Sequence, residues 1–120
     1  MYTPQVTDHY ENPRNVGTIA DASGTATVGS PASGEMVKLT LKVVDSVIVA
    51  AKFRAFGCPT AIASASALTE LVTGTQIREA EKINAVQLSE ALGGLPEDKF
   101  RYASVAENVL KNAIADFLSK

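Results

Sequence analysis

Residues 51–71, with the sequence AKFRAFGCPTAIASASALTEL, decide the fold of this 120-residue chain. The first six residues combine aromatic side chains with charges at alternating positions, which is typical of a strand. Gly57 breaks the strand, and Pro59 suits the first turn of a helix because that turn does not need its missing N–H. Small residues and good helix formers follow over 61–71. The segment therefore predicts a strand that leads directly into a helix.

Cys58, the only cysteine in the chain, stands at this junction. A thiol at a helix N-terminus meets unpaired N–H groups and the positive end of the backbone dipole, so we expect a lowered pKa. On that interpretation Cys58 is a nucleophile or a metal ligand. The alternative is a small apolar residue buried for packing. The local sequence leaves both interpretations open.

The composition limits the classes of function. The chain is 46% hydrophobic and 20% charged, as in ordinary globular domains, and its length predicts one domain spanning residues 1–120. A net charge of −2 argues against nucleic acid as the main partner. No apolar run is long enough for a membrane span, and residues 1–10 lack the pattern of a signal peptide, so we expect a cytoplasmic protein. A single cysteine excludes an internal disulfide and an ordinary cysteine-rich metal site within one chain.

Strands are predicted before most of the helices. After a short helix that ends near Asn12-Pro13, we expect strands over 24–29, 36–43 and 47–56, with a tight turn at 45–46. Helices are expected over 61–71, 76–82, 85–92 and 104–118. Thr75 is expected to cap the second, a capping box of Asn84 and Gln87 to open the third, and one of Ser104 and Glu107 to open the last. This order predicts an α+β fold, with a small three-stranded antiparallel sheet and helices packed on one face. His9, the lone histidine, is expected to be a surface or packing residue.

Three segments resemble the iron–sulfur cluster assembly scaffold family, of the IscU and NifU N-terminal type. They are DHYENPRNVG at 8–17, PASGEMVKL at 31–39 and FGCPTAIASAS at 56–66. The resemblance extends over the whole chain and implies the same α+β fold. It also implies a scaffold that is not an enzyme, that holds an iron–sulfur cluster or zinc, and that works with a cysteine desulfurase.

The family site is altered at most of its positions. Matched position by position, the family's first cysteine falls on Ser33, its aspartate on Glu35, and its second cysteine on Cys58. Its histidine and third cysteine fall on Arg101 and Tyr102.

A neighbouring segment carries the family's chaperone-recognition motif, which reads LPEDK at 95–99. Leu95, Pro96 and Lys99 are kept, and the middle of the motif is changed. By resemblance these three residues are the partner-docking positions, but the altered middle argues against chaperone recognition.

The remaining donors form a poor ligand set. A serine hydroxyl at Ser33 is hard and protonated at neutral pH, whereas iron–sulfur clusters are held by thiolates. Arg101 has no lone pair to donate, but its charge can lower the pKa of Cys58 or Tyr102, or pair with Glu35. Tyr102 binds iron only as a phenolate, which is a minor form for a phenol with a pKa near ~10. Cys58, with Glu35 and Tyr102 as weaker candidates, is therefore the expected metal-binding set, and zinc meets the same shortage of ligands.

Three hypotheses follow. In the first, the protein serves iron–sulfur assembly through Cys58, which accepts sulfur as a persulfide or shares a cluster with thiols from outside the chain. In the second, it is a divergent paralogue that binds a cysteine desulfurase or another assembly component without building clusters. In the third, it is a thiol enzyme in which Arg101 binds an anion beside Cys58. Such an enzyme needs a nearby base, and His9 is the only histidine available.

Overall fold

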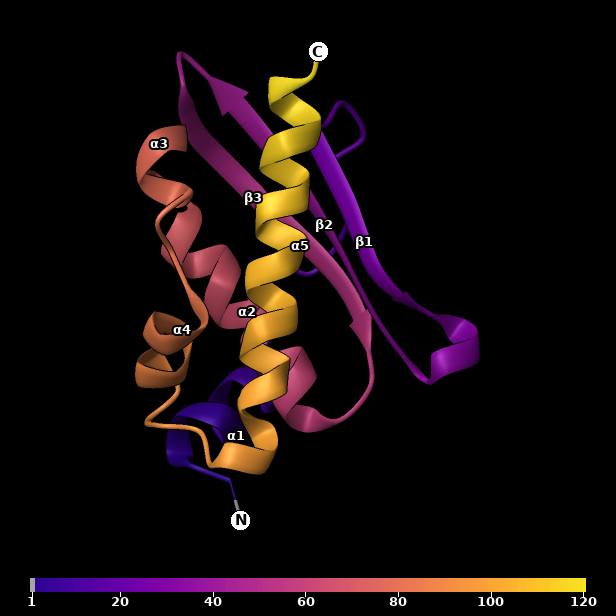
Figure 1. Cartoon of the computed structure of the whole chain (residues 1–120), viewed down its shortest axis with the longest axis vertical. Helices are drawn as coiled ribbons and strands as arrows, with labels where there is room; N and C mark the ends of the chain where they lie inside the picture. The colour runs from indigo at the N-terminus through magenta and orange to yellow at the C-terminus, as the bar shows by residue number, and fades with distance from the viewer. Residues whose placement is uncertain (1) are drawn as a thin grey trace.

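We describe residues 2–120 of the protein from a computed structural model (Figure 1). One layer of the protein is a three-stranded antiparallel sheet, with the strands in the order β1–β2–β3. The strands are β1 (Gly24–Ser30), β2 (Glu35–Val44) and β3 (Val47–Phe56). A 3₁₀ turn, η1 (Pro31–Ser33), joins β1 to β2. Asp45 and Ser46 join β2 to β3 with φ values of 53° and 65°, the positive pair that a tight hairpin turn requires.

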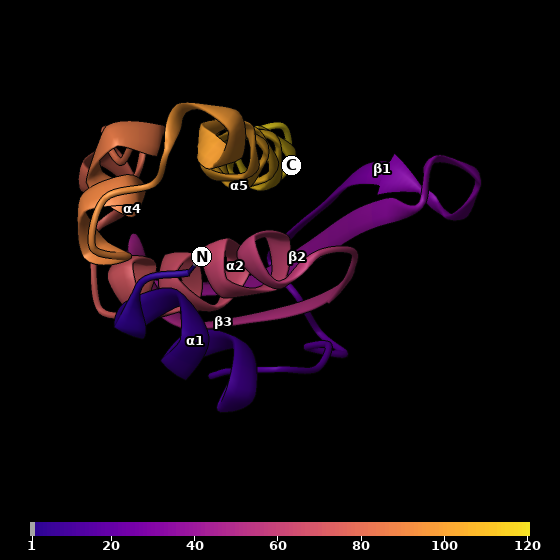
Figure 2. The same ribbon diagram turned by 90° about the horizontal axis from the view of Figure 1, so that it is seen from below.

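The helices that follow the sheet in the chain form the second layer, on one face of the sheet (Figure 2). The two long helices, α2 (Pro59–Val72) and α5 (Phe100–Leu118), pack on β3 and on β1 and β2, respectively. Gly24 allows the close approach of β1 to α5, because a Cβ at this position would collide with the Ala113 carbonyl and with Phe117. The predicted α+β architecture is confirmed.

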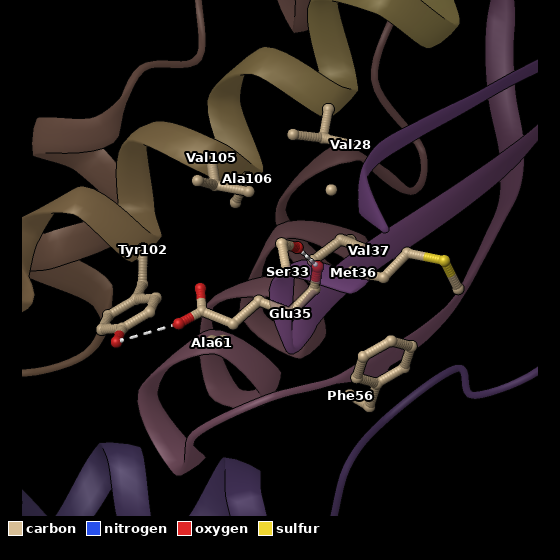
Figure 3. A pocket seen from close by; sticks show the side chains of 11 residues that line it. Val28, Ser33, Glu35, Met36, Val37, Phe56, Ala61, Tyr102, Val105 and Ala106 are labelled. Atoms are coloured by element: carbon tan, nitrogen blue, oxygen red, sulfur yellow. Dashed lines mark hydrogen bonds between the residues drawn. The ribbon is translucent and has the colours of Figure 1, made fainter. Parts of the chain in front are cut away.

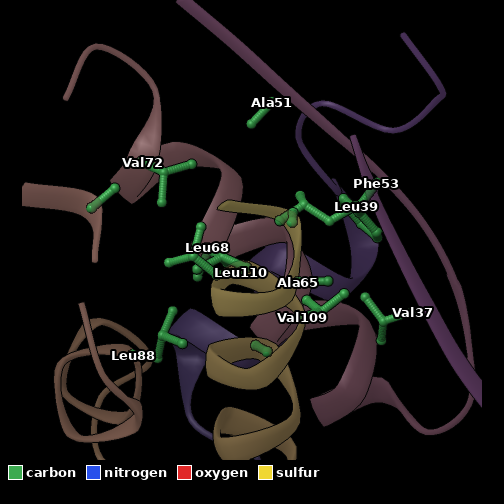
Figure 4. Packing of buried hydrophobic residues seen from close by; sticks show 14 of the residues in the cluster. Val37, Leu39, Ala51, Phe53, Ala65, Leu68, Val72, Leu88, Val109 and Leu110 are labelled. Carbon is green, nitrogen blue, oxygen red and sulfur yellow. The ribbon is translucent and has the colours of Figure 1, made fainter. Parts of the chain in front are cut away.

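The core lies between the two layers (Figure 4). The inward side chains of β2 and β3 meet those of α2 and α5, because alternate residues of a strand share a face and residues three or four apart share a helix stripe. The largest fully buried side chains include Leu39, Leu41, Ile48, Leu68, Leu88, Leu92, Leu110 and Ile114.

The first helix packs against α2, and the loop after it covers part of the outer face of the sheet. Helix α1 (Pro4–Glu11) packs on α2, and Thr3 caps it by accepting a hydrogen bond from the Val6 N–H. The loop over 12–23 then passes the edge of β3, where Val16 pairs with Phe53, and crosses the outer face of the sheet. Figure 2 shows this loop on the side of the sheet opposite to α5.

The shorter helices follow the predicted pattern in part. Helix α4 (Ala85–Ala91) has the predicted capping box of Asn84 and Gln87. Helix α3 is shorter than expected (Ile77–Ala80), and its N-cap is Gln76, because the Thr75 hydroxyl donates to the Val72 carbonyl instead. The predicted cap by Thr75 is therefore wrong.

The start of the last helix was also predicted wrongly. Helix α5 begins at Phe100, directly after the 3₁₀ turn η2 (Glu97–Lys99), and has no side-chain cap. Glu107 does not close a capping box with Ser104; its carboxylate accepts the Ala85 N–H at 2.7 Å and pairs with Lys111 at 2.6 Å. Within residues 2–120, no helix combines the length and the apolar character that a membrane span needs.

Candidate functional site

Cys58 occupies the predicted position between β3 and α2. Gly57 precedes it with φ +142°, and a Cβ there would lie 3.2 Å from Glu35 Cγ, so glycine lets β3 turn past the start of β2. The Cys58 carbonyl accepts the N–H groups of Ala61 and Ile62 at 3.0 and 3.2 Å, which makes Cys58 the N-cap of α2. Its half-buried side chain makes no capping hydrogen bond. The thiol is thus held at the helix start but left available for other contacts.

Three of the altered family positions come together beside Cys58. Arg101 Nη2 donates a hydrogen bond to the Tyr102 hydroxyl at 2.6 Å and lies 3.5 Å from Glu35 Oε1. The Tyr102 hydroxyl donates to the same Glu35 oxygen at 3.4 Å (Figure 3). The Arg101 guanidinium also lies over the Tyr102 ring, 4.5 Å from its centroid. We call Glu35, Arg101 and Tyr102 the replacement cluster.

Contact with Cys58, burial and the charge of Glu35 keep Tyr102 in its neutral form. A hydrogen bond with the Cys58 side chain, burial, and the negative charges of Cys58 and Glu35 together raise the pKa of Tyr102 to about 12, against a smaller opposing effect of Arg101. Only 6% of the Tyr102 surface is exposed. At neutral pH this residue is therefore a hydrogen-bond donor, and its pKa argues against a phenolate ligand at this position.

Ser33 lies at the same end of the sheet, but its hydroxyl is engaged in its own turn. It contacts the carbonyls of Ser30 and Glu35 at 2.8 and 2.9 Å and accepts the Ser30 N–H at 3.2 Å. These contacts stabilise the 3₁₀ turn η1 and the start of β2. The side chain that replaces the family's first cysteine therefore supports the loop.

A cavity of about 120 Å³ lies between the sheet and α5 (Figure 3). Ser33, Glu35 and Tyr102 contribute its polar groups. The rest of the lining includes the apolar residues Val28, Met36, Val37, Phe56, Ala61, Val105 and Ala106. The replacement cluster thus forms part of the wall of a small cavity next to the Cys58 loop.

The residues of the altered chaperone motif lie at the start of α5. Leu95 is half-buried, and its N–H donates to the Ser89 hydroxyl at 2.8 Å, whereas Pro96 is exposed. The ammonium group of Lys99 lies 5.9 Å from the centroid of the Tyr2 ring. This segment is therefore partly anchored to α4 and to the N-terminal residues.

His9 belongs to a different group of residues. Its Nδ1 lies 2.8 Å from the hydroxyl of Ser66, which also accepts the Arg14 N–H at 2.9 Å. Its Nε2 lies 3.4 Å from Glu70 Oε1. Burial, aided by the charge of Arg14, lowers the pKa of His9, against the opposing effects of Glu70 and Asp8. His9 is therefore a buried packing residue that joins α1 to α2, one of the two roles expected for it.

The donors near Cys58 do not make a metal centre within one chain. Among residues 2–120, no three His, Cys, Asp or Glu side chains come together in a group that could hold a metal ion. The residues beside Cys58 are a carboxylate paired with a guanidinium and a phenol kept neutral. A cluster carried here would need ligands from outside the chain, because one thiolate is far from the usual set.

Comparison with known proteins shows which family the chain belongs to. The NifU-like N terminal domain family matches residues 1–120. The chain is 46% identical over 120 residues to the iron–sulfur cluster assembly scaffold protein IscU 1 of Archaeoglobus fulgidus, covering all of this chain and 78% of that protein. It is 46% identical over 123 residues to the IscU scaffold protein of Haemophilus influenzae, covering 99% of this chain and 97% of that protein.

Solved structures show the same fold. A NifU-like N-terminal protein from Brucella abortus matches with a TM-score of 0.72 and 22% identity, over 98% of this chain and 94% of that one. A protein from Fervidobacterium islandicum matches with a TM-score of 0.74 and 20% identity, over 94% and 96% of the two chains. With the whole-chain family match and close sequence relatives, these results identify the chain as a member of the NifU-like N-terminal domain family of scaffold proteins.

Proposed function

We propose that this protein is an iron–sulfur cluster assembly scaffold that handles sulfur or a cluster through Cys58. The observation that supports this most is the position of Cys58 at the N-cap of α2, in the one part of the family site where the family thiolate is kept. The relatives that match the whole chain are named as scaffold proteins and not as enzymes, and we propose the same non-catalytic role here.

The chemistry of the site suits sulfur transfer to a single thiolate. The Cys58 thiolate attacks the terminal sulfur of a donor persulfide, the donor's S–S bond breaks, and the donor leaves as a thiolate. Cys58 then carries the persulfide, with no net oxidation or reduction. Arg101 lies close enough to stabilise negative charge at this end of the molecule, since it pairs with Glu35 and contacts Tyr102, which itself interacts with Cys58.

The cluster is cargo in this proposal. The chain offers Cys58 as its one thiolate, and the remaining ligands come from a second chain or from an external thiol. Iron–sulfur cargo is favoured over zinc by the names of the relatives. Of the two weaker candidate ligands, Glu35 remains, whereas the raised pKa of Tyr102 disfavours it as a phenolate ligand. Opening the Arg101–Glu35 pair would be required before Glu35 could bind a metal.

A cysteine desulfurase is the proposed sulfur donor. We place the protein in the cytoplasm, although relatives include a mitochondrial assembly protein of Saccharomyces cerevisiae, 43% identical over 125 residues. Chaperone recognition through Leu95, Pro96 and Lys99 is not part of this proposal, because Glu97 and Asp98 place two acidic residues in the middle of the motif.

Sulfur acceptance can be tested by mass spectrometry of the intact protein. The parent and Cys58→Ala would be incubated with a cysteine desulfurase and cysteine under anaerobic conditions. We expect the parent to gain one sulfur atom and the variant to gain none. Equal sulfur on both proteins would refute a role for Cys58.

The replacement cluster supports a second candidate function. Because Arg101, Glu35 and Tyr102 bond to one another, these side chains are engaged and do not offer ligands to a cluster. The second candidate is therefore a paralogue that docks a desulfurase without building a cluster. Such a paralogue would bind the desulfurase in a pull-down and change its activity, yet hold no iron after reconstitution. The thiol-enzyme hypothesis has less support, because His9 contacts Ser66 and Glu70, which leaves Cys58 without a histidine base.

A further inference from the structure

The outer face of the sheet carries a group of cations that the proposed function does not use. On the face opposite to the helices, Lys38 of β2 lies directly across from Arg54 of β3, and the next outward pair along the same strands is Thr40 and Lys52. We call Lys38, Lys52 and Arg54 the cationic face. Like charges directly across a strand pair destabilise a sheet, so this placement has a cost that folding does not explain.

The three cations of this face have no acidic partner. In the part of the chain that the structure describes, neither Lys38, Lys52 nor Arg54 forms an ion pair. The Arg54 side chain donates only to the neutral Thr18 hydroxyl, at 3.3 Å. Lys42, farther along the same face, does have a partner, because its ammonium group lies 3.0 Å from Asp21. The chain thus neutralises one end of the face and leaves the other end charged.

The loop over 12–23 covers the centre of this face and touches its cations without neutralising them, since the Thr18 hydroxyl accepts from Arg54 and Gly17 lies beside Lys52. The Ile19 N–H donates to the Thr40 hydroxyl at 3.1 Å, and Thr40 is only 2% exposed as a result. The side chains of Lys52 and Arg54 remain exposed, and Lys38 is half-buried. The charged end of the face is therefore open to a partner.

The cationic face continues into an apolar pair that reaches the Cys58 loop. Beyond Lys38 and Arg54, the next outward pair is Met36 and Phe56, at the end of the two strands, where both residues also border the cavity described above. Phe56 is 38% exposed although it is a large aromatic side chain, and it stands two positions before Cys58. A partner on this face would contact cations and an apolar edge, with its end beside the thiol.

We propose that the cationic face docks an acidic protein segment that carries an apolar side chain. Its carboxylates would pair with Lys38, Lys52 and Arg54, and its apolar side chain would cover Phe56 and Met36. A nucleic acid fits less well, because three cations on a chain of net charge −2 offer few phosphate contacts and no basic stripe. The interaction requires neither sulfur nor metal, so it goes beyond the proposed function.

A labelled hexaglutamate peptide with a C-terminal leucine tests the proposal by fluorescence anisotropy. The parent should bind it saturably, and added salt should weaken binding. Reversing two charges in K38E/R54E should weaken binding by about tenfold or more. The matched control R78E/K82E makes the same change in net charge at α3 and just after it, beside the β2–β3 turn at the opposite end of the sheet from Met36 and Phe56, and should bind like the parent. Cys58→Ala should also bind like the parent, which separates docking from sulfur chemistry.

Several outcomes would overturn the docking proposal. They are no saturable binding, an equal loss in R78E/K82E, or tighter binding of a single-stranded oligonucleotide through Lys38 and Arg54. If the charge-reversed protein does not fold by circular dichroism, the neutral variant K38Q/R54Q replaces it. That variant should still lose most of the affinity, and parent-like affinity would refute the proposal.

Discussion

Two serines on one helix give a sharp test of how the N-terminal helix is held. Ser64 and Ser66 both lie in α2 and are both fully buried, with 0% of their surface exposed. The Ser66 hydroxyl interacts with His9 Nδ1 at 2.8 Å and accepts the Arg14 N–H at 2.9 Å. The Ser64 hydroxyl has no hydrogen-bond partner among the described residues. The same substitution, Ser to Ala, therefore removes two interactions at one position and none at the other.

The expected free-energy changes differ clearly. Ser66→Ala leaves the buried His9 nitrogen and the part-buried Arg14 N–H without a partner. An unsatisfied group costs about 1–3 kcal/mol, and the part-buried one lies at the low end, so we expect a loss of about 2–4 kcal/mol in the free energy of unfolding. That corresponds to a fall in Tm of roughly 10 °C for a domain of this size. Ser64→Ala removes a buried hydroxyl without a bond, so we expect no change or a small gain.

Urea unfolding monitored by circular dichroism measures both variants under the same conditions. A change in the midpoint without a change in the m-value would show a change in stability with no change in the surface exposed on unfolding. Equal stabilities for Ser64→Ala and Ser66→Ala would refute the assigned bonding between α1 and α2. A large loss in Ser64→Ala would refute the claim that its hydroxyl has no partner.

Three further outcomes follow from the site and the helix contacts. Tyrosinate absorbance, measured with the other two tyrosines changed to phenylalanine, should show a pKa of about 12 for Tyr102. Glu35→Gln should lower that pKa and Arg101→Gln should raise it. No response to either change would contradict the contacts of the replacement cluster. The pKa of His9 in the folded protein lies below its ordinary 6.5, so the unfolded chain binds the proton more readily. The contribution of His9 to the free energy of unfolding should therefore be complete above pH 6.5 and fall as the pH drops below that value. A His9→Gln variant whose stability falls equally with pH would contradict this. Gly57→Ala should lower the free energy of unfolding by about 1–3 kcal/mol, measured by thermal unfolding, because φ is +142° and the new Cβ would press on Glu35. Unchanged stability would contradict this, because it would show that the loop adapts to the new side chain.

Much of the fold could be predicted because its signals are local. The alternation of apolar and polar residues over 36–43 marks a strand with one buried face, and the observed β2 buries Val37, Leu39 and Leu41. The capping box of Asn84 and Gln87 depends only on residues three apart, and it is present. Local chemistry was sufficient for these elements.

Other features depend on contacts between distant residues. Ser104 and Glu107 have the spacing of a capping box, but the Glu107 carboxylate instead binds the Ala85 N–H, 22 residues away. The bond between His9 and Ser66 joins residues 57 apart. A local sequence pattern does not show which distant residue a side chain will contact. The sequence therefore predicted only that His9 would be a surface residue or a packing residue.

The sequence indicated which residues occupy the family's site positions, but not how their side chains are arranged. Matching the family motifs placed Glu35, Arg101 and Tyr102 at altered positions, and the sequence allowed Arg101 to pair with Glu35. The structure adds that Arg101 also bonds and covers Tyr102, and that Tyr102 is nearly buried with a raised pKa. These properties arise from the packing of α5 on the sheet, which brings residues 35 and 102 together.

The measurement that tests the central claim most directly is iron and acid-labile sulfide per chain after anaerobic reconstitution, with visible absorption. It would be made on the parent and on Cys58→Ala. We predict that the parent retains iron and sulfide and that the variant loses both. Equal loading of the variant, or no loading of either protein, would contradict a scaffold that works through Cys58.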